Sequence, residues 1–137
     1  MPSPDSKGTI EWNKVKEDGV KMAFSRLGEG ETYIDPTFSE NFQKSRIAGI
    51  PSGAWHIFRA KSNTPEAQAR TIINTLKEAG FTNKDSFAFE VYNKSGGNKT
   101  ATKNEMANNL ADLIQRIIDS DIPVYTNNLY IKTNIDT

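Results

Sequence analysis

The chain of 137 residues contains no cysteine and a single histidine, His56. The first absence excludes disulfide bridges and thiolate metal sites. The second leaves no histidine cluster, so we expect neither a metal nor a cofactor. Lys and Arg number 17, as do Asp and Glu, so the formal net charge is zero. A protein that follows the phosphates of a nucleic acid needs a basic surface, so we expect no nucleic-acid partner.

Long apolar runs are also absent. No stretch approaches the roughly 20 apolar residues that cross a bilayer, and the N-terminal MPSPDSKG has no apolar core typical of a signal peptide. We therefore expect a soluble chain without a membrane partner, whose location the sequence leaves open. The length fits one domain over residues 1–137, with an irregular segment over 1–8 and the folded part over 9–137.

Short apolar runs alternate with helical patterns along the chain, which predicts an α/β fold with about four parallel strands and right-handed helical crossovers. The predicted strands are Val20–Arg26, Gly53–Phe58, Ser86–Tyr92 and Ile122–Thr126. Predicted helices cover 12–18, 37–48, 64–79 and 102–117, and a short helix-like tail follows the last strand.

Two helix starts are marked by side chains that can cap them. Thr64 can accept a hydrogen bond from the first turn, and Pro65 suits the first helical position. Thr102 and Glu105 have the spacing of a capping box. Gly80 predicts the end of the helix that Pro65 begins.

Four segments, in order, resemble glycoside hydrolase family 25, the muramidase-type lysozymes. They are GTIEWNKVKEDGVKMAFSR (8–26), EGETYIDPTFSENFQKSRIAGIP (29–51), GAWHIFRA (53–60) and IPVYTNN (122–128). The resemblance implies a partial (β/α) barrel related to the TIM-like barrel of that family. It covers the family's second to fifth strands, about two thirds of the fold, so the first strand with its catalytic Asp and the last three strands have no counterpart.

The resemblance implies a lysozyme-like N-acetylmuramidase that hydrolyses peptidoglycan β-1,4 bonds and acts at the cell wall. It assigns Glu90 as proton donor and Glu29 as a second candidate catalytic residue. The family's Asp-x-Glu pair reads Ala88-Phe89-Glu90 here. Alternation places Ala88 and Glu90 on one face, so the acid remains while its partner carboxylate is a methyl group. This leaves open a catalytically dead derivative that binds glycan or a partner protein, or a remnant without its own function.

Candidate substrate-binding residues are Trp55, Tyr92, Tyr125 and Arg59, because aromatic faces suit sugar rings and arginine suits acidic groups. The three aromatic residues are expected to gather near the same mouth of the barrel. Core packing for the aromatic residues and a surface role for Arg59 are the alternatives. Glu29 and Glu90 can equally be solvated or ion-paired acids. The alternation of side chains along the predicted strand points His56 toward the helical layer, where we expect a core histidine. The loop 93–99 (NKSGGNK) either covers glycan or is a simple connection.

Same-handed crossovers would place every helix on one face of the sheet. The other face would then expose apolar side chains, for which the candidates are Met22, Phe24, Trp55, Ile57 and Tyr92. Apolar area of that size and two open sheet edges favour association. We therefore predict a homodimer, or a partner chain, that completes the barrel, or terminal segments that cover the sheet.

Overall fold

A computed structural model describes residues 10–61, 63–92 and 98–134. The elements are, in chain order, α1 (Trp12–Glu17), β1 (Ala23–Glu29), β2 (Tyr33–Ile34), α2 (Phe38–Ile47), β3 (Ser52–Ile57), α3 (Pro65–Ala79), β4 (Ser86–Tyr92), α4 (Lys103–Ile118) and β5 (Leu129–Asn134).

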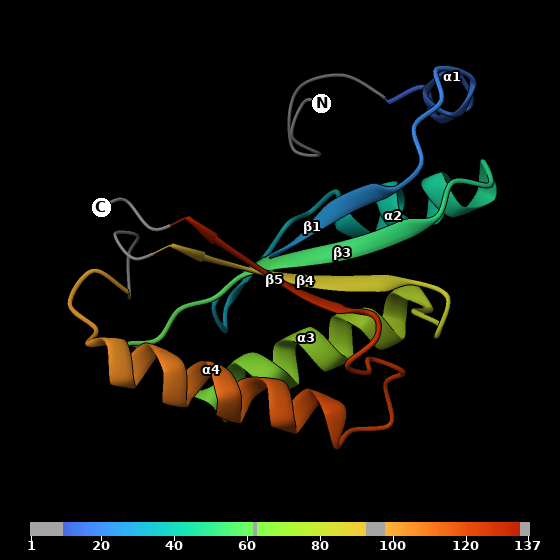
Figure 1. Cartoon of the computed structure of the whole chain (residues 1–137). Helices are drawn as coiled ribbons and strands as arrows, with labels where there is room; N and C mark the ends of the chain where they lie inside the picture. The colour runs from blue at the N-terminus through green and yellow to red at the C-terminus, as the bar shows by residue number, and fades with distance from the viewer. Residues whose placement is uncertain (1–9, 62, 93–97, 135–137) are drawn as a thin grey trace.

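The five strands form one sheet in the order β2-β1-β3-β4-β5. All neighbours are parallel except the short β2, which pairs with β1 in the antiparallel direction. The α/β class and the sequential order of parallel strands are thus confirmed, while the sequence analysis did not anticipate β2. In Figure 1, α3 and α4 run side by side along one face of the sheet, and α2 packs against β1 and β3.

The core lies between this helical layer and the sheet. Every second strand residue enters it, as Ala54, Phe87 and Phe89 do, and each is fully buried. Leu113 and Ile117 of α4 meet them from the helical side. The strand residues that alternate with these core residues project from the opposite face of the sheet.

The predicted helix signals are present in the structure. Thr64 accepts a hydrogen bond from the Ala67 amide at 3.0 Å, and Gly80 closes α3 with φ of 74°. Thr102 and Glu105 form the reciprocal capping box, with N–O distances of 3.0 and 3.1 Å. Local side-chain chemistry therefore determines where these helices begin and end.

The predicted strand Ile122–Thr126 is wrong. Ile122 and Val124 are buried in the core, but they lie in a turn in which the Val124 amide donates to the Ile122 carbonyl at 2.8 Å. Pro123 has no amide hydrogen for a ladder, which disfavours a strand with neighbours on both sides. The strand is instead β5, formed by residues that the sequence analysis placed in a helix-like tail. The first strand is also displaced, since it begins at Ala23 instead of Val20 and extends to Glu29.

Asn128 holds this turn beside the start of β4. Its amide nitrogen donates to the carbonyls of Asp85 (3.1 Å) and Pro123 (3.0 Å), and its side-chain oxygen accepts from the Tyr125 amide (2.7 Å). Asn128 thereby directs the chain into β5, whose first residue, Leu129, is in register with Phe87 of β4. Among the described residues, no helix has the length and apolarity needed to cross a membrane.

Candidate functional site

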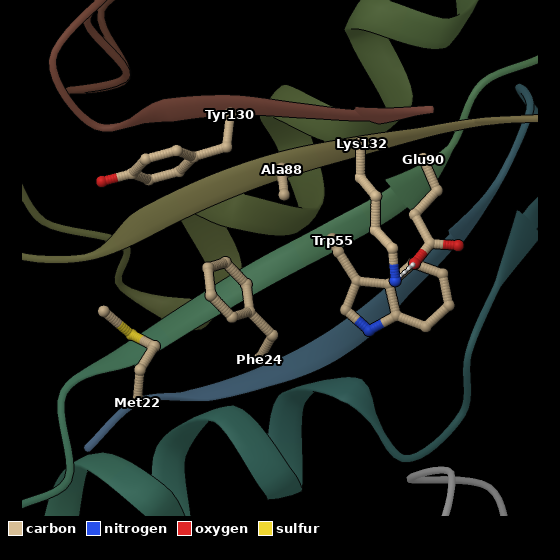
Figure 2. A pocket seen from close by; sticks show the side chains of 7 residues that line it. All are labelled: Met22, Phe24, Trp55, Ala88, Glu90, Tyr130 and Lys132. Atoms are coloured by element: carbon tan, nitrogen blue, oxygen red, sulfur yellow. Dashed lines mark ion pairs between the residues drawn. The ribbon is translucent and has the colours of Figure 1, made fainter. Parts of the chain in front are cut away.

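The face of the sheet opposite the helices bears a hollow of about 560 Å³. Alternate residues of neighbouring strands line it because they project to the same side. Trp55 is in register with Ala88, which is in register with Tyr130. Two residues further along these strands, on the same face, Glu90 is in register with Lys132. The described residues that line it are Met22, Phe24, Trp55, Ala88, Glu90, Tyr130 and Lys132 (Figure 2).

The hollow has two halves of different chemistry. At the amino ends of the strands, Met22, Phe24 and Tyr130 form what we call the apolar half, and all three are more than a third exposed. Toward the carboxyl ends, Glu90 and Lys132 form an ion pair that we call the polar half, and Trp55 lines the hollow between the two halves (Figure 2). The predicted exposure of Met22 and Phe24 on this face is confirmed.

Glu90 is the acid of the polar half. The Tyr92 hydroxyl donates a hydrogen bond to its Oε2 atom, and Lys132 Nζ lies 3.7 Å from its Oε1 atom. The Glu90 side chain is 14% exposed, so the carboxyl group is partly removed from solvent yet open to the hollow. Its two polar neighbours fix its orientation from two sides. The grouping of Glu90 with Trp55 and Tyr92, which the sequence suggested, is found here.

Ala88 shares this face with Glu90, as alternation predicted. Its methyl group occupies the wall between Phe24, Trp55 and Tyr130 (Figure 2). Among the described residues that line the hollow, Glu90 is the single carboxylate. A reaction that needs two converging carboxylates therefore finds one of them, Glu90, among the described residues of the hollow.

Glu29 and Arg59 lie in a separate polar cleft of about 370 Å³ at the ends of β1 and β3, together with Arg26, Thr32, Tyr33 and Asn63. The Arg59 guanidinium donates to the Glu29 carboxylate through Nε at 2.5 Å. Arg26 makes a similar pair with the buried Asp35, at 3.0 Å. The structure thus pairs Glu29 with Arg59 and does not bring either one into the hollow beside Glu90.

Tyr125 is not part of either site, which corrects its predicted place near the other aromatic residues. It is half exposed in the turn before β5, at the amino end of that strand, whereas Glu90 lies toward the carboxyl end of β4. The misplaced strand Ile122–Thr126 caused this error. Tyr130 and Lys132 occupy the face instead, and the alternation of Leu129-Tyr130-Ile131-Lys132 was a signal that could have identified them.

Asn98 is a further residue that the sequence analysis did not single out. It is buried, and its side chain accepts from the Ala60 amide at 2.6 Å and donates to the carbonyls of Phe58 (2.9 Å) and Tyr92 (2.8 Å). It therefore ties the carboxyl ends of β3 and β4 together behind the polar half. Most of the predicted covering loop, residues 93–97, lies outside the described residues.

His56 points into the helical side of the sheet, as predicted, and is fully buried. Its Nε2 atom lies 2.8 Å from the Gly30 carbonyl, while Nδ1 has no hydrogen-bond partner among the described residues. Burial lowers the pKa of His56 from 6.5 to about 4, although the hydrogen bond to Gly30 opposes the shift. The ring is therefore neutral near pH 7 and acts as a fixed link to the turn that carries Glu29. Across 10–61, 63–92 and 98–134, no group of three or more potential metal ligands occurs.

A mostly parallel sheet in sequential strand order with helical crossovers, and an acid toward the carboxyl ends of its strands, is compatible with part of a (β/α) barrel, in which sites are built at those ends. The family model of glycosyl hydrolases family 25 matches residues 5–137, and the chain belongs to that family. The predicted resemblance is confirmed.

Two curated relatives carry lysozyme names. The chain is 26% identical over 133 residues to an autolytic lysozyme of Clostridium acetobutylicum, covering 96% of this chain and 39% of the relative. It is 38% identical over 63 residues to lysozyme M1 of Streptomyces globisporus, covering 46% of this chain and 21% of the relative. The chain thus spans about two fifths, or less, of the length of these relatives.

Solved structures support the fold. A family 25 glycosyl hydrolase from Bacillus anthracis superposes with a TM-score of 0.74 at 19% identity, over 92% of this chain and 55% of that one. The modular autolysin LytC from Streptococcus pneumoniae, solved in complex with a synthetic peptidoglycan ligand, gives 0.73 at 18% identity, over 90% of this chain and 29% of that one. At these identities the likeness concerns the fold alone.

Proposed function

We propose that this chain acts on peptidoglycan at the cell wall as an N-acetylmuramidase, which hydrolyses the β-1,4 bond between N-acetylmuramic acid and N-acetylglucosamine. The observation that carries the proposal is the polar half of the hollow. There a partly buried acid, Glu90, lines an open hollow together with the indole ring of Trp55. Membership of family 25 and the lysozyme names of the relatives support the same reaction.

In this proposal Glu90 donates the proton that the leaving glycosidic oxygen needs. Tyr92 orients the carboxyl group through its hydrogen bond to Oε2. Trp55 offers a flat apolar surface for the sugar ring that is bound beside the acid. The pair of Glu29 and Arg59 borders the same end of the sheet and is proposed to contact more distant sugar units.

A second candidate function is recognition of cell-wall glycan without turnover. Ala88 favours it, because the position on the face of Glu90 that would hold a second carboxylate is a methyl group.

Incubation with labelled peptidoglycan distinguishes the two functions. Wild type, Glu90→Gln and the control Glu78→Gln, which changes an exposed acid on α3, would be compared for release of reducing ends. Release by the wild type and the control but not by Glu90→Gln supports the hydrolase. Pelleting of all three proteins with peptidoglycan, without release, supports recognition alone. A protein that neither binds nor cleaves peptidoglycan would contradict both proposals.

We also propose that a second copy of the chain, or a partner chain that completes the barrel, covers the apolar half of the hollow. Barrel interiors are filled with side chains, and Met22, Phe24 and Tyr130 are exposed in the isolated chain. The polar half at the carboxyl ends would remain open to glycan. Light scattering at micromolar concentration should give about twice the 15.3 kDa of one chain for a homodimer. A monomer that binds no hydrophobic dye would contradict this proposal.

A further inference from the structure

Lys132 is placed to do more than pair with Glu90. It extends from β5 toward Glu90 of β4, so that its ammonium group and the Glu90 carboxyl group meet in the hollow that Trp55 also lines (Figure 2). Of the seven described residues that line the hollow, it is the basic one. Its side chain is 67% exposed, which leaves the ammonium group accessible to a ligand that enters from solvent.

The contact with Glu90 does not use the hydrogen-bonding capacity of Lys132. The distance of 3.7 Å between Nζ and Oε1 is longer than a hydrogen bond, so the pair is held by charge alone. Glu90 receives its hydrogen bond from Tyr92 instead. An ammonium group has three N–H donors, and those of Lys132 remain available for an acceptor in the hollow.

The neighbouring cations are already committed to acids. Arg26 is bound to Asp35, and Arg59 is bound to Glu29, each through nitrogen atoms of the guanidinium group. An anionic ligand in the hollow would therefore find its counter-charge in Lys132. Because Trp55 and Lys132 line the same hollow, one ligand bound there can contact both side chains.

We propose that Trp55 and Lys132 together form a subsite that selects a sugar bearing a carboxylate. The proposal rests on the proposed action on peptidoglycan and names the recognition element within it. Trp55 would bind the apolar face of the ring, and Lys132 would bind the carboxylate in a charge-assisted contact. In peptidoglycan the carboxylate comes either from the lactyl group of N-acetylmuramic acid, free where no stem peptide is attached, or from the stem peptide itself.

Binding of three defined tetrasaccharides by calorimetry tests this subsite. The first alternates N-acetylglucosamine with N-acetylmuramic acid and has free lactyl groups, the second carries stem peptides on those groups, and the third is neutral chitotetraose. Because Lys132 is largely exposed, we expect about a three- to tenfold preference of the wild type for a carboxylate ligand over chitotetraose. The preference should weaken at high salt.

Lys132→Met should abolish that preference while binding of chitotetraose stays unchanged. Lys132→Arg should retain it, and the control Lys103→Met, at the start of α4, should behave as wild type. A preference for the first ligand identifies the lactyl carboxylate, and a preference for the second identifies the peptide. Equal binding of all three ligands, unaffected by Lys132→Met, would overturn the subsite but leave the proposed function standing. Absence of binding to every ligand would overturn both.

Discussion

The buried His56 should make folding stability depend on pH in a way that one substitution can isolate. Its pKa in the folded chain is about 4 because burial disfavours the charged ring, while the ordinary value of 6.5 applies once the chain unfolds. Between these values the unfolded chain binds the proton and the folded chain does not. The stability that depends on the neutral ring is therefore complete above pH 6.5 and is lost as the pH falls toward 4.

The magnitude follows from the size of the shift. A difference of one pKa unit corresponds to about 1.4 kcal/mol, so the whole shift amounts to roughly 3 kcal/mol. About 2 kcal/mol of this should be lost between pH 7 and pH 5. His56 is completely buried, so solvent screening does not reduce the figure.

Urea unfolding at pH 7 and pH 5 of the wild type and His56→Gln measures the effect. Glutamine keeps an N–H donor for the Gly30 carbonyl but does not titrate. Acids elsewhere contribute equally to both proteins and cancel in the comparison. We expect the wild type to lose about 2 kcal/mol more than the variant. Equal losses in the two proteins would refute the reasoning, since they would mean that His56 binds protons alike in both states.

Three further predictions concern packing, the sheet edge and the site. Leu113→Ala, at the fully buried contact of α4, should lower the free energy of unfolding by about 2–5 kcal/mol in urea. Gly28→Ala should detach β2, because a Cβ atom there would collide with the Tyr33 carbonyl. Faster hydrogen exchange of the Asp35 amide, which donates to the Leu27 carbonyl of β1 at 2.8 Å, would reveal it, and unchanged exchange would contradict it. Ala88→Asp should increase reducing-end release, since it adds a carboxylate on the face of Glu90, whereas Ala88→Asn should not.

Much of the fold could be predicted because local signals agreed with the tertiary structure. The caps at Thr64 and Thr102 and the terminating Gly80 act within a few residues of their own position, so their effect is legible in sequence. β4 was predicted with its observed bounds because a run of β-formers is bounded on both sides by polar residues. Alternation then placed Ala88 and Glu90 on one face correctly.

The errors arose where distant contacts decide the structure. The segment from Ile122 to Thr126 has the composition of a strand, yet Asn128 and Pro123 hold it in a turn through a bond to Asp85, 43 residues away in sequence. That error moved Tyr125 toward the site and left Lys132 unnoticed. The burial of Asn98 between β3 and β4 likewise depends on partners that no local pattern reveals.

The two faces of the sheet have different roles: one packs against the helices in the core, and the other lines the hollow. Residues such as Phe87 and Phe89 project into the helical core, while Ala88 and Glu90, on the same strand, project into the hollow. Because the period of a strand is two residues, a change on one face leaves the other face in place. The residue at position 88 can therefore differ in chemistry, as in the Ala88→Asp variant, without a change in the core that Phe87 and Phe89 form.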